Sequence, residues 1–201
     1  PGQGSPLKVA EKKGFDFIII RESTEGLFAS HGKGRVNGDQ SAEETLVITR
    51  EVSEKLFEFA FNLARRRKET GKGPGKVHCV QRPEMFGVMV TENMFGDILS
   101  DLGAGIMGSL GLAPSADIGL DSAVFQPCHG SAPDIAGKGL ANPLAMILSA
   151  SMMLEWLGHE HGVSEMLDAS ERVTAAVNDV IGEGRIMTPD LGGSANTDAV
   201  A

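Results

Sequence analysis

The sequence predicts an α/β fold, because segments typical of strands alternate along the chain with segments typical of helices. Short runs rich in β-branched and aromatic residues, such as 15–20, indicate buried strands. Longer segments, such as the one that follows Thr49, repeat apolar residues at helical spacing. The 201 residues show neither an internal repeat nor a clear linker, and the length suits one domain of good size or two small ones.

The first half of the chain begins with the strand at 15–20. The glycine-rich stretch 21–38 predicts a loop or hairpin, and 45–49 is a second short strand candidate. Thr49 is the expected N-cap of the helix that follows. That helix ends in the four cations 65–68, which suit the negative end of a helix dipole. They indicate a solvated helix end rather than a phosphate or nucleic-acid patch.

The second half continues the alternation. Further strands are predicted at 77–80, 87–91 and 123–126, and helices at 93–110, 144–157 and 163–181. The segment 71–76 predicts a turn and not a phosphate-binding loop, because no serine or threonine follows its last lysine. The glycines of 103–108 have the spacing of a dinucleotide fingerprint, but they extend a helix instead of following a strand, so they indicate close packing or a helix end. Asn142 and Pro143 are expected to begin the helix at 144–157, which is predicted to be buried.

Composition excludes several functions. A formal net charge of −9, from 18 Lys and Arg against 27 Asp and Glu, argues against a nucleic-acid partner. No apolar stretch reaches the roughly 20 residues that a membrane span needs, so we expect no membrane partner. Two cysteines do not make a disulfide framework, and a reducing, cytoplasmic location is therefore expected. Because the chain has no tyrosine, no mechanism can take a phenol from it.

Two carboxylates in the helix predicted at 93–110 form the first candidate site. A spacing of four residues places Asp97 and Asp101 on one helical face. Like charges one turn apart repel each other, so a cation beside them is a natural partner, and oxygen ligands suit Mg²⁺ or Mn²⁺. The apolar flanks Phe95 and Ile98 indicate that the pair borders a buried site. The alternative is an ordinary solvated helix face.

A polar, glycine-rich loop at 127–142 is the second candidate. It follows a strand and leads into a helix whose N-terminus attracts anions, and its backbone donors, histidine and aspartate suit a nucleotide. An ordinary connection between a strand and a helix is the alternative. Cys128 and His129 do not make a thiol dyad simply by being adjacent, since neighbouring side chains diverge.

Arg21 is the third candidate. An arginine at the end of a buried strand is well suited to hold a carboxylate through two hydrogen bonds. A structural ion pair with Glu22 or Glu25 explains the same residue equally well on sequence alone.

Together these motifs resemble a known family. The segments Arg21–Phe28, Thr91–Asp101 and His129–Pro143 occur in this order, and the closing segment Thr188–Thr197 matches as well. All four resemble signatures of the isocitrate/isopropylmalate dehydrogenases, the metal-dependent β-decarboxylating dehydrogenases. The resemblance covers nearly the whole chain. It implies a mixed-sheet α/β subunit with two domains, of which residues 1–201 form a part, and a homodimer with active sites at its interface.

The resemblance also implies an activity. It implies that a nicotinamide cofactor oxidises a small-molecule 2-hydroxy acid, which then loses its β-carboxylate as CO₂. Arg21 would bind a substrate carboxylate, and Asp97 and Asp101 would ligate the Mg²⁺ or Mn²⁺ that holds the substrate and stabilises charge on its oxygen. We expect 3-isopropylmalate as the substrate, with isocitrate, D-malate and tartrate as alternatives.

The same resemblance assigns the adenosine half of the cofactor to the loop at 129–142. The dipeptide Asp134–Ile135 implies NAD, because a carboxylate holds ribose hydroxyls and repels a 2′-phosphate, whereas NADP users of the family tend to have Lys-Tyr there. The cofactor-binding residues implied in this way are His129, Gly130, Ser131, Ala132, Pro133, Asp134, Ile135, Asn142 and Asp190.

Two departures from the family concern missing segments. The family has a large N-terminal portion before the Arg21 motif, and several tens of residues between the positions of Val80 and Gln81. The latter include a lysine and an aspartate that reach the partner subunit's active site. We interpret the chain as joined segments of a longer protein, and the alternative is a truncated, inactive chain.

A third departure concerns the proton relay. Phe28 stands where the family has its relay tyrosine, so its assignment as the catalytic position is in doubt. This residue favours a rival hypothesis, in which the protein is a non-catalytic regulatory or binding member of the family. A thiol enzyme that uses Cys79 or Cys128 is a further hypothesis.

Overall fold

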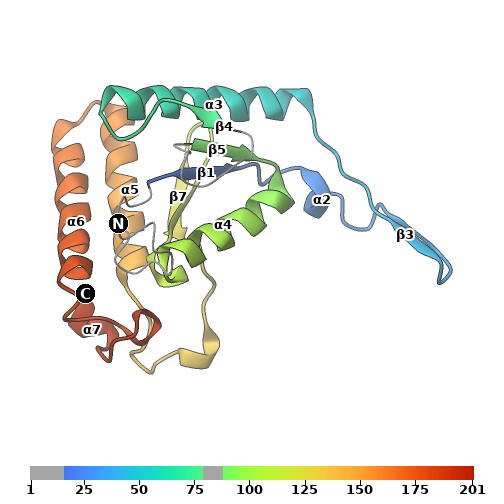
Figure 1. Cartoon of the computed structure of the whole chain (residues 1–201). Helices are drawn as coiled ribbons and strands as arrows, with labels where there is room; N and C mark the ends of the chain where they lie inside the picture. The colour runs from blue at the N-terminus through green and yellow to red at the C-terminus, as the bar shows by residue number, and fades with distance from the viewer. Residues whose placement is uncertain (1–15, 79–87) are drawn as a thin grey trace. The chain divides into compact units, whose positions relative to one another are not determined.

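The computed structural model describes residues 16–78 and 88–201 (Figure 1). These residues form two units, 16–102 and 103–201, and each is described by itself. Some sequence predictions lie outside the described residues. They are the first residue of the strand at 15–20, the ends of the strands at 77–80 and 87–91, Cys79, and the junction between Val80 and Gln81.

A three-stranded parallel sheet is the centre of the first unit. Its strands are β1 (Ile18–Arg21), β5 (Val88–Thr91) and β4 (Val77–His78), in the order β1-β5-β4. All four residues of β5 are buried, because this strand lies between the other two. The register pairs Arg21 with Thr91. Since parallel strands end at the same edge of a sheet, Arg21 therefore lies beside the segment that follows Thr91.

Helix α3 (Arg50–Glu69) runs along the sheet next to β4 and β5 (Figure 1). Ala60 and Ala64 are buried against the sheet, where their small side chains allow the helix a close approach. The predicted cap is confirmed, because the Thr49 side chain accepts a hydrogen bond from the Val52 N–H. The last turn contains three of the predicted cations, of which Arg67 forms an ion pair with Asp16 at 2.7 Å.

The stretch predicted as a loop or hairpin contains both a helical turn and a hairpin. Helix α2 (Gly26–Ala29) follows β1, and β2 (Arg35–Asn37) then pairs with β3 (Ser41–Glu43) in an antiparallel hairpin. Every residue of the two strands is exposed, and the hairpin projects as an arm (Figure 1). The loop-or-hairpin prediction for 21–38 is therefore confirmed in outline.

The prediction of a strand at 45–49 is wrong. This segment makes a single β-bridge, between Val47 and Gly26, instead of a ladder. The Glu25 carboxylate fixes its end by accepting hydrogen bonds from the backbone N–H and the hydroxyl of Thr49. Leu46 and Ile48 remain about half exposed, at 47% and 54%, so their apolar character does not reflect a buried strand.

Helix α4 (Asn93–Met107) follows β5 almost directly. The Glu92 carboxylate accepts a hydrogen bond from the Phe95 N–H and so satisfies a donor in the first turn. The helix ends three residues before the predicted boundary of 110, because Gly108 adopts a φ of 116° that ordinary helical residues avoid. The interpretation of the 103–108 glycines as a helix end is confirmed at Gly108.

The second unit combines a β-hairpin with two long helices. Strand β6 (Pro114–Ile118), which the sequence did not predict, pairs antiparallel with β7 (Ala123–Pro127), which it did. Helices α5 (Leu144–His161) and α6 (Ser164–Glu183) pack side by side (Figure 1). One face of α5 is buried as predicted, whereas Met146 on another face is 55% exposed. The core of this unit is Leu112, Leu144, Val177 and Val200.

Short elements complete the second unit. They are the 3-10 helices η2 (Leu110–Leu112), η3 (Pro133–Ile135) and η4 (Pro189–Leu191), and helix α7 (Thr197–Val200). Parallel strands covered by a helix in one unit, and a hairpin packed on helix α5 in the other, confirm the mixed α/β class. None of the helices in the described part of the chain combines the length and hydrophobicity that crossing a bilayer requires.

Candidate functional site

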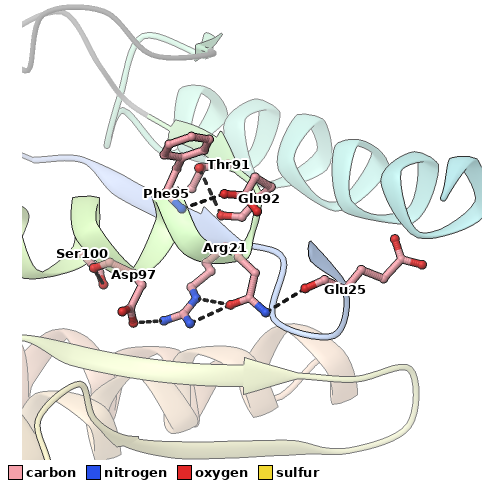
Figure 2. A network of polar contacts seen from close by, with 8 residues as sticks. Arg21, Glu25, Thr91, Glu92, Phe95, Asp97 and Ser100 are labelled. Carbon is pink, nitrogen blue, oxygen red and sulfur yellow. Dashed lines mark hydrogen bonds and ion pairs between the residues drawn. The ribbon is translucent and has the colours of Figure 1, made fainter. Parts of the chain in front are cut away.

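Arg21 is the centre of a polar network at the edge where β1 and β5 end (Figure 2). Its Nη1 donates to Asp97 Oδ1 of α4 at 2.5 Å. Its Nε and Nη2 both donate to Asn93 Oδ1, at 3.0 and 2.7 Å. The structure thus brings together Arg21 and Asp97, two of the predicted site residues, although 76 positions separate them in the sequence.

The alternative ion pairs of Arg21 do not form. The Glu22 carboxylate accepts hydrogen bonds from Thr24 and from the Glu25 N–H, while the Glu25 carboxylate binds Thr49. Burial raises the pKa of Glu22, but these hydrogen bonds and the charge of Arg21 lower it below its usual value. The Glu22 carboxylate therefore binds within the loop after β1 and the Glu25 carboxylate binds the N-cap of α3, which leaves the Arg21 guanidinium to face α4.

Gly96 allows Arg21 to reach Asp97. A Cβ at position 96 would lie 2.5 Å from Cγ and 2.8 Å from Cβ of Arg21. Such separations are well below van der Waals contact, so the arginine stem would have to move. The glycine one position before Asp97 is thus what lets the arginine pack against this turn of α4.

The predicted metal ligands lie on α4 as expected. Asp97 and Asp101 are one helical turn apart, and both carboxylates reach solvent. Within the described residues no group of three or more histidine, cysteine or carboxylate side chains could hold a metal ion. Mg²⁺ is commonly held by only one or two carboxylates and keeps several waters, so this pair of oxygen donors fits Mg²⁺ or Mn²⁺ as part of a ligand set.

Phe28 lies beside the same network. It belongs to α2, its side chain is 49% exposed, and its ring centroid is 6.0 Å from Arg21 Cζ, within cation–π range. The position identified with the family's relay tyrosine is thus next to the candidate substrate arginine. A phenyl ring lacks the hydroxyl group through which a tyrosine would donate or accept a proton.

Sequence reasoning missed Asn93. Its side chain is buried, accepts two of the three side-chain hydrogen bonds that Arg21 donates, and itself donates from Nδ2 to the Glu25 carbonyl oxygen at 3.0 Å. A signal for it existed, because Asn93 comes two residues after a buried strand, and a polar residue so close to a strand end lies at the edge where a parallel neighbour ends. Using that signal required the pairing of β1 with β5, which the sequence alone does not give.

A second polar network joins two of the predicted cofactor residues in the other unit. The Ser109 hydroxyl and Asn142 Nδ2 both donate to Asp190 Oδ2, the latter at 3.0 Å. Asn142 Oδ1 also accepts from the Leu144 N–H at 3.0 Å and so satisfies a donor at the start of α5, although Pro143, and not Asn142 as predicted, occupies the N-cap position. A Cβ at Gly111 would lie 2.7 Å from Asn142 Cβ, so a glycine there permits this packing.

The remaining predicted cofactor residues lie along the loop that leads to η3 and α5. His129 Nδ1 is 2.9 Å from the Gly130 carbonyl oxygen, to which it donates when it carries the proton. Ala132 adopts a left-handed φ of 44° directly before η3, which contains Asp134. From His129 to Asp134 every residue is exposed. Exposed backbone donors and an accessible carboxylate fit a nucleotide that carries ribose hydroxyls.

Asp190 provides a pH-dependent test of the second network. Burial raises its pKa, but hydrogen bonds from the Ser109 hydroxyl and the Asn142 amide lower it below the usual 3.8. The ionised side chain therefore stabilises the fold above pH 3.8, and this contribution is lost as the pH falls through the lower folded-state value. We expect Asp190→Asn to lower the free energy of unfolding at neutral pH, with a smaller difference from wild type in acid.

Urea denaturation at neutral pH and again below pH 3.8 measures this effect. Asp179→Asn, an exposed carboxylate on α6, is the matched control and should show little change at either pH. A difference between Asp190→Asn and wild type that stays constant over this range would contradict the assignment.

Comparison with known proteins supports the sequence resemblance. A profile of the family described as isocitrate/isopropylmalate dehydrogenase matches residues 1–72 and 74–201. A protein of Methanocaldococcus jannaschii named 3-isopropylmalate/3-methylmalate dehydrogenase is 42% identical, over 90% of this chain and 64% of its own length. An isocitrate/homoisocitrate dehydrogenase of Thermus thermophilus is 40% identical, over 99% of this chain and 67% of its own length.

A solved structure gives the same result for the fold. The crystal structure of isocitrate dehydrogenase from Methylococcus capsulatus has a TM-score of 0.72 and 38% identity, over 90% of this chain and 64% of that one. The chain thus spans about two thirds of the length of these proteins. The two sequence matches run over 224 and 236 residues, more than the 201 of the chain, so the relatives have internal residues without a counterpart here.

Proposed function

This chain belongs to the isocitrate/isopropylmalate dehydrogenase family, and from that premise we propose that the protein catalyses the NAD-dependent oxidative decarboxylation of a 2-hydroxy acid such as 3-isopropylmalate. The position of Arg21 is the main support. The Arg21 guanidinium can bind a substrate carboxylate through two hydrogen bonds, and its Nη1 lies 2.5 Å from Asp97 Oδ1. Asp97 is one of two carboxylates that lie one turn apart on α4. A negatively charged hydroxy acid and a divalent cation would therefore meet at one edge of the sheet.

The proposed reaction has two stages. In the first, the carbon that bears the hydroxyl gives a hydride to NAD⁺ and the hydroxyl proton is released, which yields a 2-oxo acid and NADH. In the second, the bond to the β-carboxylate breaks, CO₂ leaves, and the electron pair remaining on the product takes up a proton. Arg21 holds and orients a carboxylate of the substrate throughout. Asp97 and Asp101 would hold Mg²⁺ or Mn²⁺, which would supply positive charge next to the substrate oxygen on which negative charge develops.

The panel of substrates is the direct test. The names of the two relatives include 3-isopropylmalate, 3-methylmalate, isocitrate and homoisocitrate, so the family allows different substituents on the acid. NADH formation should be followed by absorbance with 3-isopropylmalate, isocitrate, D-malate and tartrate, each with and without Mn²⁺. We expect Mn²⁺-dependent turnover that is fastest with 3-isopropylmalate. If the full-length protein turns over none of the four, the enzyme proposal fails.

NAD specificity is proposed from Asp134. The double substitution Asp134→Lys with Ile135→Tyr should shift the ratio of kcat/KM for NADP over NAD upward by about a hundredfold, because a cation replaces an anion beside the 2′ position of the ribose. Steady-state kinetics with each cofactor measures the ratio. Asp121→Lys makes the same charge change in the exposed turn between β6 and β7 and should leave the ratio unchanged. An unchanged ratio in the double variant would place cofactor selection elsewhere.

A non-catalytic member of the family is the rival proposal, and Phe28 is the observation that favours it. If the protein is such a member, wild type is inactive and Phe28→Tyr should raise turnover by about a hundredfold or more, since general acid–base catalysis contributes 10² to 10⁴. If the enzyme proposal is correct, wild type turns over 3-isopropylmalate and Phe28→Tyr changes kcat much less. Phe57→Tyr, an exposed phenylalanine on α3, controls for the added hydroxyl.

We also propose that the internal residues present only in the relatives belong between Val80 and Gln81, and that residues 1–201 are part of a single two-domain subunit. The length of the two matches supports a longer protein. Mass spectrometry of the purified protein tests it, and a mass near 21.1 kDa would contradict it. We further propose a homodimer, which is what membership of the family leads us to expect. Light scattering of the protein measures that state.

A further inference from the structure

The proposed function assigns no role to Asn93. It begins α4, and only 3% of its surface is exposed. Its Oδ1 accepts two hydrogen bonds from Arg21, while its Nδ2 donates to the Glu25 carbonyl oxygen. One neutral amide therefore joins the end of β1, the loop that leads to α2, and the start of α4.

We propose that Asn93 is a positioning residue, which fixes the direction of the Arg21 guanidinium for a substrate carboxylate. The inference rests on the proposed function, because it requires Arg21 to bind that carboxylate. A guanidinium has five N–H donors. Asn93 takes two of them, from Nε and Nη2, and Asp97 takes one from Nη1. Within the described residues the two donors that remain are one on Nη1 and one on Nη2, the number that a carboxylate accepts in a bidentate pair.

The chemistry of the amide matters as well as its position. Arg21 already lies beside one carboxylate, that of Asp97. A second carboxylate at position 93 would give the group a net negative charge and weaken its attraction for an anionic substrate. The neutral amide oxygen orients the guanidinium without cancelling its charge. An arginine held in this way also loses less side-chain entropy when the substrate binds.

Hydrogen exchange of the Arg21 Nε proton, followed by NMR of the full-length protein without substrate, tests the geometry directly. Arg21→Lys, which lacks Nε, assigns the signal. We expect Asn93→Ala to accelerate exchange of this proton by about tenfold, the change expected from loss of one hydrogen bond. Asn93→Asp keeps the acceptor and should keep the proton protected. Asn62→Ala, which removes an exposed asparagine that accepts from Arg65 on α3, is the matched control and should not change it.

Kinetics with 3-isopropylmalate test the consequence. Asn93→Ala should raise KM for this acid about tenfold, with a smaller change in kcat and none in KM for NAD. In an Arg21→Ala background the same substitution should add less than about twofold, because Asn93 acts through Arg21. A purely structural role predicts the opposite, namely equal effects in both backgrounds.

The outcomes separate the inference from the function on which it rests. If Arg21 Nε exchange in Asn93→Ala equals that of wild type, the positioning role is wrong whether or not the protein is active. If exchange accelerates but wild type turns over none of the four acids, the positioning geometry stands and the proposed function fails. If Asn93→Ala does not fold, Asn93→Ser replaces it, because serine is favoured at helix starts but is too short to reach both donors of Arg21.

Discussion

Asp101→Ala and Asp97→Ala should each lower kcat/KM for 3-isopropylmalate at least a thousandfold, about 4 kcal/mol of transition-state stabilisation. Each substitution removes one of only two carboxylates that the described chain offers to a divalent cation on α4. Mn²⁺ binding to the protein without substrate, measured by calorimetry, should weaken in parallel. Mn²⁺ alone is the probe, so the measurement does not depend on activity.

The two variants differ in a useful way. Asp97 also binds Arg21, whereas among the described contacts of Arg21 there is none with Asp101, so Asp101→Ala tests the cation site with the arginine network intact. Asp168→Ala, which removes an exposed carboxylate from α6, should change neither turnover nor Mn²⁺ binding. If Asp101→Ala leaves Mn²⁺ affinity at the wild-type value, the ligand assignment is wrong.

Local signals in the sequence predicted the elements that depend on local chemistry. Thr49 caps α3 through a hydrogen bond three residues along the chain, and such a contact can be inferred without the fold. The run at 45–49 shows the limit of this approach. Its apolar residues resemble a strand, yet the end of the segment is held by the distant carboxylate of Glu25. Strand β6 was missed for the converse reason. Its proline and aspartate are unfavourable in strands, so the local sequence does not predict one, yet pairing with β7 stabilises it.

The candidate site divides in the same way. Residue types and spacing identified Arg21 and the pair on α4 as chemically capable groups, but the sequence offered Glu22 and Glu25 as partners for the arginine. The actual partner depends on the register of β1 with β5, which aligns Arg21 with the strand end that precedes Asn93. Long-range pairing is set by packing of the whole sheet and is not encoded in any one segment. Asn93 could not be found until that register was known.

Arg21→Ala should lower kcat/KM for 3-isopropylmalate by about a hundredfold or more, about 3 kcal/mol, because it removes the charge-assisted contact with the substrate carboxylate.

Gly96→Ala tests the same geometry without changing the arginine itself. The added Cβ would lie 2.5 Å from Arg21 Cγ and displace the side chain, so KM for the acid should rise, while KM for NAD should not. Steady-state kinetics in both substrates measures this, and Gly105→Ala on the same helix, where a Cβ meets nothing within 4 Å, is the control. A Gly96→Ala variant with wild-type KM for the acid would show that substrate binding does not depend on how Arg21 packs against α4.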